Sequence, residues 1–310
     1  MAQIGIMIEG QDGLNWPRWE RLLKAAEDFG YQCLFRSDHF ANAGPPEKDS
    51  LELWVSLTYA ASHTRRIEFG SLVCPTTFRH PAMTVRMAAQ VDDLSNGRLV
   101  LGLGAGWNEY EHRKFGIPFY DVPTRFEMLT DALEITMRLL MSDGPVSYQG
   151  KHFSLDDAIL LPRPKRPGGP PVLIGGKGPR RTLPLVAKYA DEWNGVFIPL
   201  ETYRERNAQL NDLLAQHGRE PGDVKRSLMT QVIFGKDDAD LRVKLAGRDK
   251  GDGELFKRGY LVGTAGALVD QIGQFVEAGA ERFMLQWLDQ DDIEGLERMA
   301  RDVLPHFHKN

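Results

Sequence analysis

The neighbouring residues Asp38 and His39 combine two side-chain types that move protons in many enzymes. They follow an apolar segment, residues 33–35, that has the composition of a buried strand. An imidazole at a strand end can donate or withdraw a proton, or stabilise charge on a bound ring. An isolated histidine there more often bonds only to loop backbone, but the adjacent aspartate favours catalysis, so we take both residues as catalytic candidates. The sequence leaves open whether Asp38 orients the imidazole or caps the loop.

A glycine-rich turn in the second half of the chain has the composition of a phosphate site. It consists of Gly175, Gly176, Lys177 and Gly178 and precedes a helix expected at 180–190, with Pro179 in its first turn. Exposed N–H groups, the helix dipole and the lysine can face one anion. Residues 158–190 contain no acidic residue and seven basic ones, namely Arg163, Lys165, Arg166, Lys177, Arg180, Arg181 and Lys188. We expect the turn and Arg181 to bind a cofactor phosphate; the alternative is a solvated basic helix face.

Another glycine-rich turn, Gly104-Ala105-Gly106, follows the apolar run at 99–103. Counted from Gly102, its spacing is Gly-x-Gly-x-Gly rather than the dinucleotide pattern Gly-x-Gly-x-x-Gly, so it is weak evidence for NAD. Missing Cβ atoms would instead allow the backbone to approach a flat ring. We therefore expect Gly104, Ala105 and Gly106 to contact a cofactor.

Several further residues at predicted strand ends have types that suit a substrate pocket. They are Glu9, Phe40, Trp107 and Trp287. Glu109, Glu111 and His112 could in principle bind a metal, but they lie at a helix start without a His-Glu-x-x-His pattern. We interpret these three as capping or surface residues and expect no metal site.

The elements that must position these residues alternate regularly along the chain. Short apolar runs followed by amphipathic stretches predict strands at 4–8, 33–35, 67–73, 99–103, 172–174, 192–197, 228–234 and 282–288. This count of strands and helical segments favours an α/β fold, a (β/α)₈ TIM barrel, over a Rossmann-like domain with an extension. The residues that follow each barrel strand would then meet at one mouth.

Two segments depart from this alternation. Residues 142–171 contain a turn and a proline-rich stretch, which predict a hairpin insertion between the fourth and fifth units of a single domain spanning 1–310. Residues 245–260 are rich in Gly, Asp and Lys and predict a mobile loop near the barrel mouth.

The charge balance narrows the class of partner. The chain has 38 basic and 43 acidic residues and a net charge of −5, which argues against nucleic acid or an anionic membrane and favours a small-molecule substrate. We expect no membrane span, because no apolar run approaches about 18 residues. Two isolated cysteines and the lack of a basic leader favour the cytoplasm. Apolar faces at 83–94 and 124–140 are compatible with a homodimer.

Seven ordered motifs give the chain a family resemblance. They are Ser37-Asp38-His39-Phe40, Arg65-Arg66-Ile67-Glu68-Phe69-Gly70-Ser71-Leu72-Val73, Arg79-His80-Pro81, Ser95-Asn96-Gly97-Arg98, Gly104-Ala105-Gly106-Trp107 with Ile174-Gly175-Gly176-Lys177-Gly178, and Tyr189-Ala190-Asp191-Glu192-Trp193-Asn194. The chain resembles the luciferase-like monooxygenase superfamily, in the branch of F420-dependent oxidoreductases, over nearly its whole length. This resemblance implies a TIM barrel that holds reduced flavin or the deazaflavin coenzyme F420 with its ring at the mouth.

The resemblance also implies roles for individual residues. In similar proteins a histidine equivalent to His39 lies beside the reactive ring carbon, and a non-prolyl cis peptide, matched here by Ser71-Leu72, backs the ring. The turn at Gly175 would hold the cofactor phosphate. Some sugar-phosphate-oxidising relatives have a catalytic glutamate where this chain has Trp107, which argues against that activity.

These inferences lead to three functions. We predict hydride transfer between coenzyme F420 and a small organic substrate, with the basic region around Lys177 also able to meet the polyglutamate tail of F420. The alternative is an FMN-dependent monooxygenase that uses O₂, since both cofactors need a phosphate cradle. A non-catalytic flavin-binding protein is the third function, and the intact Asp38 and His39 pair argues against it.

Overall fold

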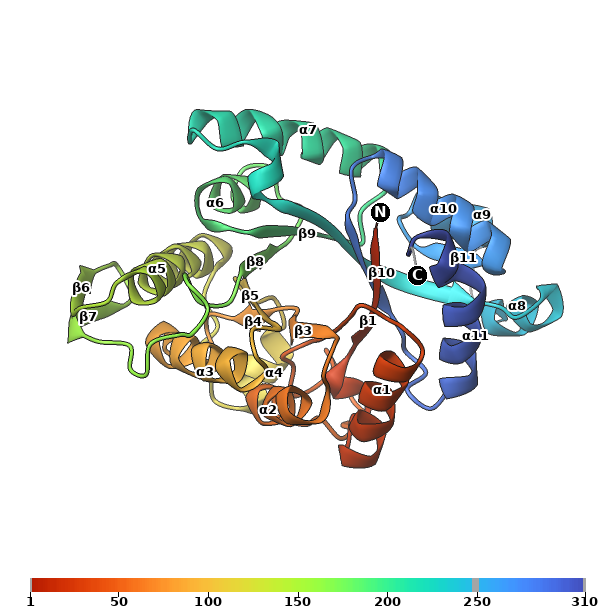
Figure 1. Ribbon diagram of the computed structural model, residues 1–310, viewed down its shortest axis with the longest axis horizontal. Helices are drawn as coiled ribbons and strands as arrows, with labels where there is room; N and C mark the ends of the chain where they lie inside the picture. Colours follow the sequence, from red (N-terminus) through yellow and green to blue (C-terminus); the bar gives the residue numbers. More distant parts are fainter. Residues whose placement is uncertain (1, 247–250, 309–310) are drawn as a thin grey trace.

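Eight parallel strands form a closed barrel with helices around it (Figure 1), in a computed structural model that describes residues 2–246 and 251–308. The barrel strands are β1 (Gln3–Ile8), β2 (Cys33–Arg36), β3 (Glu68–Ser71), β5 (Leu99–Gly104), β8 (Val172–Gly175), β9 (Glu192–Val196), β10 (Lys225–Phe234) and β12 (Arg282–Gln286). Strand β12 pairs with β1 and closes the ring. The predicted (β/α)₈ fold is confirmed.

The helices form the outer layer. The longer ones are α1 (Trp16–Asp28), α2 (Leu53–His63), α3 (Pro81–Leu94), α5 (Val122–Met141), α7 (Leu200–Gln216), α10 (Ala265–Glu277) and α11 (Ile293–Val303). Short helices are α4 (Glu109–Lys114), α6 (Thr182–Tyr189), α8 (Asp238–Leu245) and α9 (Asp252–Lys257), with 3₁₀ turns at Gly10–Asp12, Pro221–Asp223 and Leu304–His306. No helix in the described part of the chain is both long and apolar enough to cross a membrane.

Helix α1 shows how the local sequence specifies these elements. The Asn15 side chain accepts a hydrogen bond from the Arg18 N–H and so caps the first turn, where a free N–H would otherwise remain. Trp19, Leu22 and Leu23 then lie on one face and are buried against the barrel. A polar cap followed by an apolar stripe thus fixes both the start of the helix and the face it buries.

The barrel interior is filled unevenly along its axis. At the amino ends of the strands, Arg282 pairs with Glu68 and, at 2.9 Å, with Glu192, so charged groups close the floor. Above the floor lie apolar side chains from several strands, including Phe35, Val100, Leu173 and Met284. Both levels are occupied by protein atoms, which leaves the carboxyl ends of the strands to hold a ligand.

The two segments outside the regular alternation have defined places. Strands β6 (Val146–Gln149) and β7 (Ser154–Ala158) form an antiparallel hairpin between the fourth and fifth units, beside α5, as expected (Figure 1). In the segment expected as a loop, 245–260, α9 forms after residue 251. A short strand outside the barrel, β11 (Leu261–Gly263), follows this segment. The loop prediction for residues 247–250 falls outside the described residues, and the mobility of the segment stays a prediction.

Candidate active site

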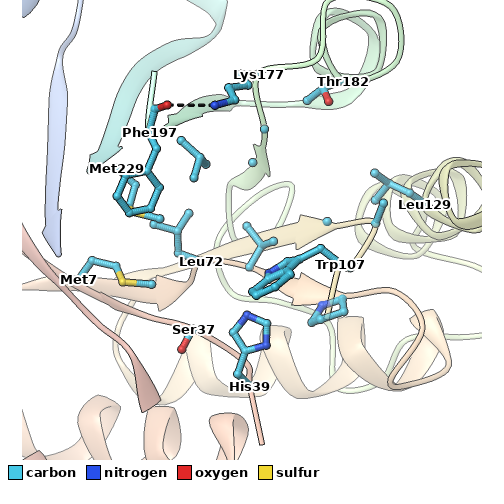
Figure 2. Close-up of a pocket in the computed structure, with 18 of the residues that line it drawn as sticks. Met7, Ser37, His39, Leu72, Trp107, Leu129, Lys177, Thr182, Phe197 and Met229 are labelled. Carbon is cyan, nitrogen blue, oxygen red and sulfur yellow. Dashed lines mark hydrogen bonds between the residues drawn. The ribbon is translucent and has the colours of Figure 1, made fainter. Parts of the chain in front are cut away.

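A cavity of about 520 Å³ opens at the carboxyl ends of the barrel strands. The candidates that line it are Glu9, His39, Leu72, Gly104, Ala105, Gly106, Trp107, Gly175, Gly176 and Lys177. In Figure 2, His39 and Trp107 lie at one end of this cavity and Lys177 and Thr182 at the other. The structure therefore brings the imidazole and the glycine-lysine turn onto one shared space.

The His39 imidazole is held by a carboxylate that is distant in sequence. Its Nδ1 lies 2.7 Å from Oε1 of Glu111, and the second carboxylate oxygen accepts the Phe40 N–H at 3.0 Å. Glu111 is fully buried in α4, so its interpretation as a capping or surface residue is wrong. The Asn108 side chain caps α4 and accepts the Glu111 N–H, which fixes the first turn so that this carboxylate faces inward. Spacing alone could not reveal the pair.

Asp38 has a different partner from the one its position suggested. Its carboxylate binds the guanidinium of Arg79, which also donates to Glu52 at 2.6 Å. Asp38 is buried and is not among the residues that line the cavity. It does not orient the imidazole, and a catalytic role for it stays a prediction.

The surroundings of His39 favour its charged form. Burial alone would lower the pKa of the imidazole, but the hydrogen bond and the negative charge of Glu111 outweigh burial, with smaller contributions from Glu9 and Asp38. The pKa of His39 therefore lies above the usual histidine value. A side chain only 13% exposed is thus kept ready to hold a proton at the cavity wall.

The opposite end of the cavity is built by the turn after β8. The Lys177 ammonium donates to the Phe197 carbonyl at 3.0 Å, and the Thr182 side chain lines the cavity beside it. Helix α6 begins at Thr182 rather than at 180, and the N–H groups of Thr182 and Leu183 both donate to the Gly178 carbonyl. The N–H groups of Thr182 and Leu183 are therefore already used, and the Lys177 ammonium and the Thr182 hydroxyl are side-chain groups that can meet an anion at this end.

Two of the residues predicted to bind the cofactor phosphate do not line the cavity. Gly178 does not line the cavity, because its carbonyl is turned toward the start of α6. Arg181 does not line it either; its guanidinium lies 5.9 Å from the centre of the Phe126 ring. Thr182 was missed because a threonine in a first helical turn is common and has no distinguishing spacing.

The non-prolyl cis peptide joins Leu72 to Val73, one residue later than the expected Ser71-Leu72 pair. Ser71 still belongs to the sheet, because its hydroxyl donates to the Gly102 carbonyl and accepts the Gly102 N–H. Ser71 consequently faces away from the cavity, while Leu72 and Val73 line it.

The glycines of β5 are needed for close approach between strands. A Cβ on Gly104 would lie 2.4 Å from Cγ2 of Val73, and one on Gly102 would lie 2.1 Å from the Ser71 carbonyl oxygen. The first collision is with the segment that follows β3, and the second is with the last residue of β3 itself. From the sequence we expected the missing Cβ atoms to leave room for a ring. In the structure they leave room for the Leu72–Val73 segment, which forms the cavity wall.

Of the four residues predicted for the substrate pocket, two line the cavity and two pack elsewhere in the fold. Glu9 and Trp107 line the cavity, and the Trp107 indole, 63% exposed, meets the His39 ring edge-on at 5.4 Å. Phe40 instead stacks on Phe78, because Glu111 holds its backbone and turns the ring toward α4. Trp287 follows Gln286 at the end of β12 and, by alternation, points into the layer between barrel and helices.

Comparison with known proteins agrees with this geometry. The family model described as luciferase-like monooxygenase matches residues 2–252. The chain belongs to this family. A relative from Intrasporangium calvum, named F420-dependent glucose-6-phosphate dehydrogenase, is 25% identical over 313 residues, covering 90% of this chain and 91% of the relative. Another from Streptomyces nodosus subsp. asukaensis, named 4-hydroxyprotoasukamycin monooxygenase, is 28% identical and covers 96% of this chain and 89% of its own.

The same fold occurs in solved structures. An F420-dependent secondary alcohol dehydrogenase, solved in complex with an F420-acetone adduct, superposes with a TM-score of 0.86 at 21% identity and covers 99% of both chains. Together, the family match and the named relatives make the chain an oxidoreductase of the luciferase-like family.

Proposed function

We propose that the chain transfers hydride between coenzyme F420 and a small organic substrate. The observation that carries this proposal is a single cavity with the His39–Glu111 pair at one end and Lys177 at the other. A tricyclic ring with a phosphorylated arm needs a site with two such ends. The relative named as an F420-dependent dehydrogenase, aligned over 90% of this chain, supports the choice of cofactor.

The middle of the cavity suits a flat ring. Met7, Leu72 and Met229 line its apolar wall (Figure 2), and Gly104 and Gly106 add backbone without side chains. Bound F420 supplies a ring carbon that accepts or releases hydride. The Leu72–Val73 segment would support the ring, and Lys177 with Thr182 would hold the phosphate of the arm. Excluding water along this wall strengthens the electrostatic effect of the neighbouring charged groups.

His39 handles the proton that accompanies the hydride. When an alcohol is oxidised, the O–H proton would pass to neutral His39 as the C–H bond breaks, and bound F420 would supply the acceptor for the hydride. In the reductive direction the imidazolium returns the proton to the carbonyl oxygen. Glu111 stabilises the charged imidazole in both directions and fixes which ring nitrogen faces the cavity.

A second candidate function is FMN-dependent monooxygenation. The relative named as a monooxygenase aligns with 96% of this chain, and the Lys177 end suits the phosphate of FMN as well. The two functions differ in the cofactor that must bind, so binding separates them.

The test is titration of the purified protein with F420 and with FMN, followed by ring fluorescence. We expect saturable binding of F420 and hydride transfer to or from it on addition of substrate. Lys177→Glu should weaken F420 binding more than tenfold, because the ammonium would face the phosphate. Lys151→Glu, a matched charge reversal in the β6–β7 hairpin, should leave binding unchanged.

Three results would count against the proposal. Tight binding of FMN without any response to F420 would favour the monooxygenase. F420 that binds but is never reduced or oxidised across a panel of alcohols and carbonyl compounds would favour the non-catalytic protein. Equal effects of the two lysine reversals would remove Lys177 from the phosphate site.

A further inference from the structure

Glu9 places a carboxylate on the cavity wall, near His39. It lies directly after β1, and its two oxygens accept hydrogen bonds from neutral amides, Oε1 from Gln286 at 2.6 Å and Oε2 from Gln11 at 2.9 Å. Gln290 also donates to its backbone carbonyl at 2.8 Å. A carboxylate has about four acceptor positions, so two remain for another donor. The amides thus fix the orientation of Glu9 without neutralising it.

No ion pair with a lysine or arginine reaches Glu9 within residues 2–246 and 251–308. The nearby guanidinium of Arg36 is buried and donates to Ser37, Ser56 and Leu51 instead. Arg79 is likewise engaged, with Asp38 and Glu52. Both cations are therefore committed to other groups behind the cavity wall.

Charge is distributed unequally between the two ends of the cavity. Among the described lining residues, Lys177 is the one lysine or arginine, and it lies at the end opposite His39 (Figure 2). The His39 end contains the carboxylate of Glu9 and, behind the imidazole, that of Glu111. A protonated His39 would balance only one of these two carboxylates, so the His39 end keeps a net negative charge and would repel a second anionic group.

From this asymmetry we infer that Glu9 selects the substrate by charge: the substrate is a hydrogen-bond donor without negative charge, such as a neutral alcohol or an amino alcohol. This inference rests on the proposed F420-dependent function, in which the Lys177 end is occupied by the cofactor arm. The reacting hydroxyl donates to His39, and a second donor of the substrate, such as the ammonium of an amino alcohol, binds the free acceptor positions of Glu9, so that the reacting carbon lies between Glu9 and His39. Phosphorylated sugars and hydroxy acids are excluded.

Three secondary alcohols of similar size test the inference, because they differ only in the terminal group. They are pentan-2-ol, which is neutral, 4-aminobutan-2-ol, which is a cation, and 3-hydroxybutanoate, which is an anion. Their dissociation constants are measured by ligand-observed NMR, with and without F420. We expect 3-hydroxybutanoate to bind at least tenfold more weakly than pentan-2-ol, and 4-aminobutan-2-ol to bind at least as tightly as pentan-2-ol.

A pair of charge-neutralising variants assigns the discrimination to one residue. Glu9→Gln should reduce the difference between the anion and the neutral alcohol to less than threefold. Glu205→Gln, which removes the same charge from an exposed position on α7, should preserve the full difference. Glu9→Asp keeps the charge and should preserve exclusion of the anion. The ratio of the dissociation constants of the anion and the neutral alcohol is measured on the unaltered protein, so it tests the inference even where Glu9→Gln fails to fold.

The outcomes separate this inference from the proposed function. Equal binding of the anion and the neutral alcohol, no saturable binding of any of the three, or an unchanged ratio in folded Glu9→Gln would overturn the inference even if F420 binds. Failure of F420 to bind, with the alcohol ratio intact and lost in Glu9→Gln, would instead overturn the cofactor proposal and leave charge selection by Glu9 standing.

Discussion

Nδ1 of His39 lies 2.7 Å from Oε1 of Glu111, although the two residues are 72 positions apart in the chain. His39 follows β2 and Glu111 lies in the first turn of α4, which follows β5, and the barrel brings both to the same mouth. The pair forms the proton-handling end of the cavity, and it gives the first prediction.

Glu111→Gln should shift the pH dependence of turnover to lower pH. The unaltered pKa of His39 is raised because Glu111 outweighs burial; without the charge, burial dominates and lowers the pKa. The limb that reports His39 should therefore move to lower pH in both reaction directions, and reductive turnover near neutral pH, which needs the imidazolium, should fall at least tenfold. Glu109→Gln, an exposed change in the same helical turn, is the control. An identical pH profile in both variants would separate Glu111 from the chemistry.

Arg79→Met should destabilise the protein strongly. It leaves the Asp38 carboxylate, 1% exposed, without its cation, and an unpaired buried charge costs about 3–5 kcal/mol. The double variant Asp38→Asn with Arg79→Met should recover part of this loss, because the buried charge is gone. Urea unfolding of the single and double variants measures the difference, and additive losses would show that the two side chains act independently.

Gly104→Ala should disturb the cavity wall. The alanine Cβ would lie 2.4 Å from Cγ2 of Val73, so the Leu72–Val73 segment must shift. Overpacking of this kind costs about 1–3 kcal/mol. We expect lower thermal stability together with weaker cofactor binding. Adding Val73→Ala should restore both in part.

The control for this change is Gly144→Ala. A Cβ at Gly144 meets no heavy atom within 4 Å, and this glycine does not have a positive φ. Its stability and cofactor binding should remain those of the unaltered protein. If Gly104→Ala behaves in the same way, the close approach between Gly104 and Val73 does not constrain the wall.

The sequence predicted the fold more completely than the site, for a physical reason. Short apolar runs are buried on both faces of a parallel sheet, so the eight strands could be recognised locally. His39, Gly176 and Lys177 were found because they directly follow such runs. Family resemblance added the cofactor class.

What could not be predicted depends on which way a side chain points after its strand ends. Glu111 was taken for a capping or surface residue because its partner is distant in sequence. Phe40 lies next to the lining residue His39 and Trp287 follows the end of β12, but both side chains point to other layers of the fold. The start of α6 was placed too early because the Gly178 carbonyl, rather than a side chain, caps it. The homodimer, the cytoplasmic location and the single-domain boundary stay predictions.

A crystal structure of the protein with F420 bound tests most directly whether the cofactor lies in the cavity between His39 and Lys177. We expect the deazaflavin ring against Leu72 and Val73, its reactive edge toward His39, and the phosphate of its arm within hydrogen-bonding distance of Lys177 or Thr182. A ring bound outside this cavity, or a phosphate held by other residues while the Lys177 end stays free, would contradict it.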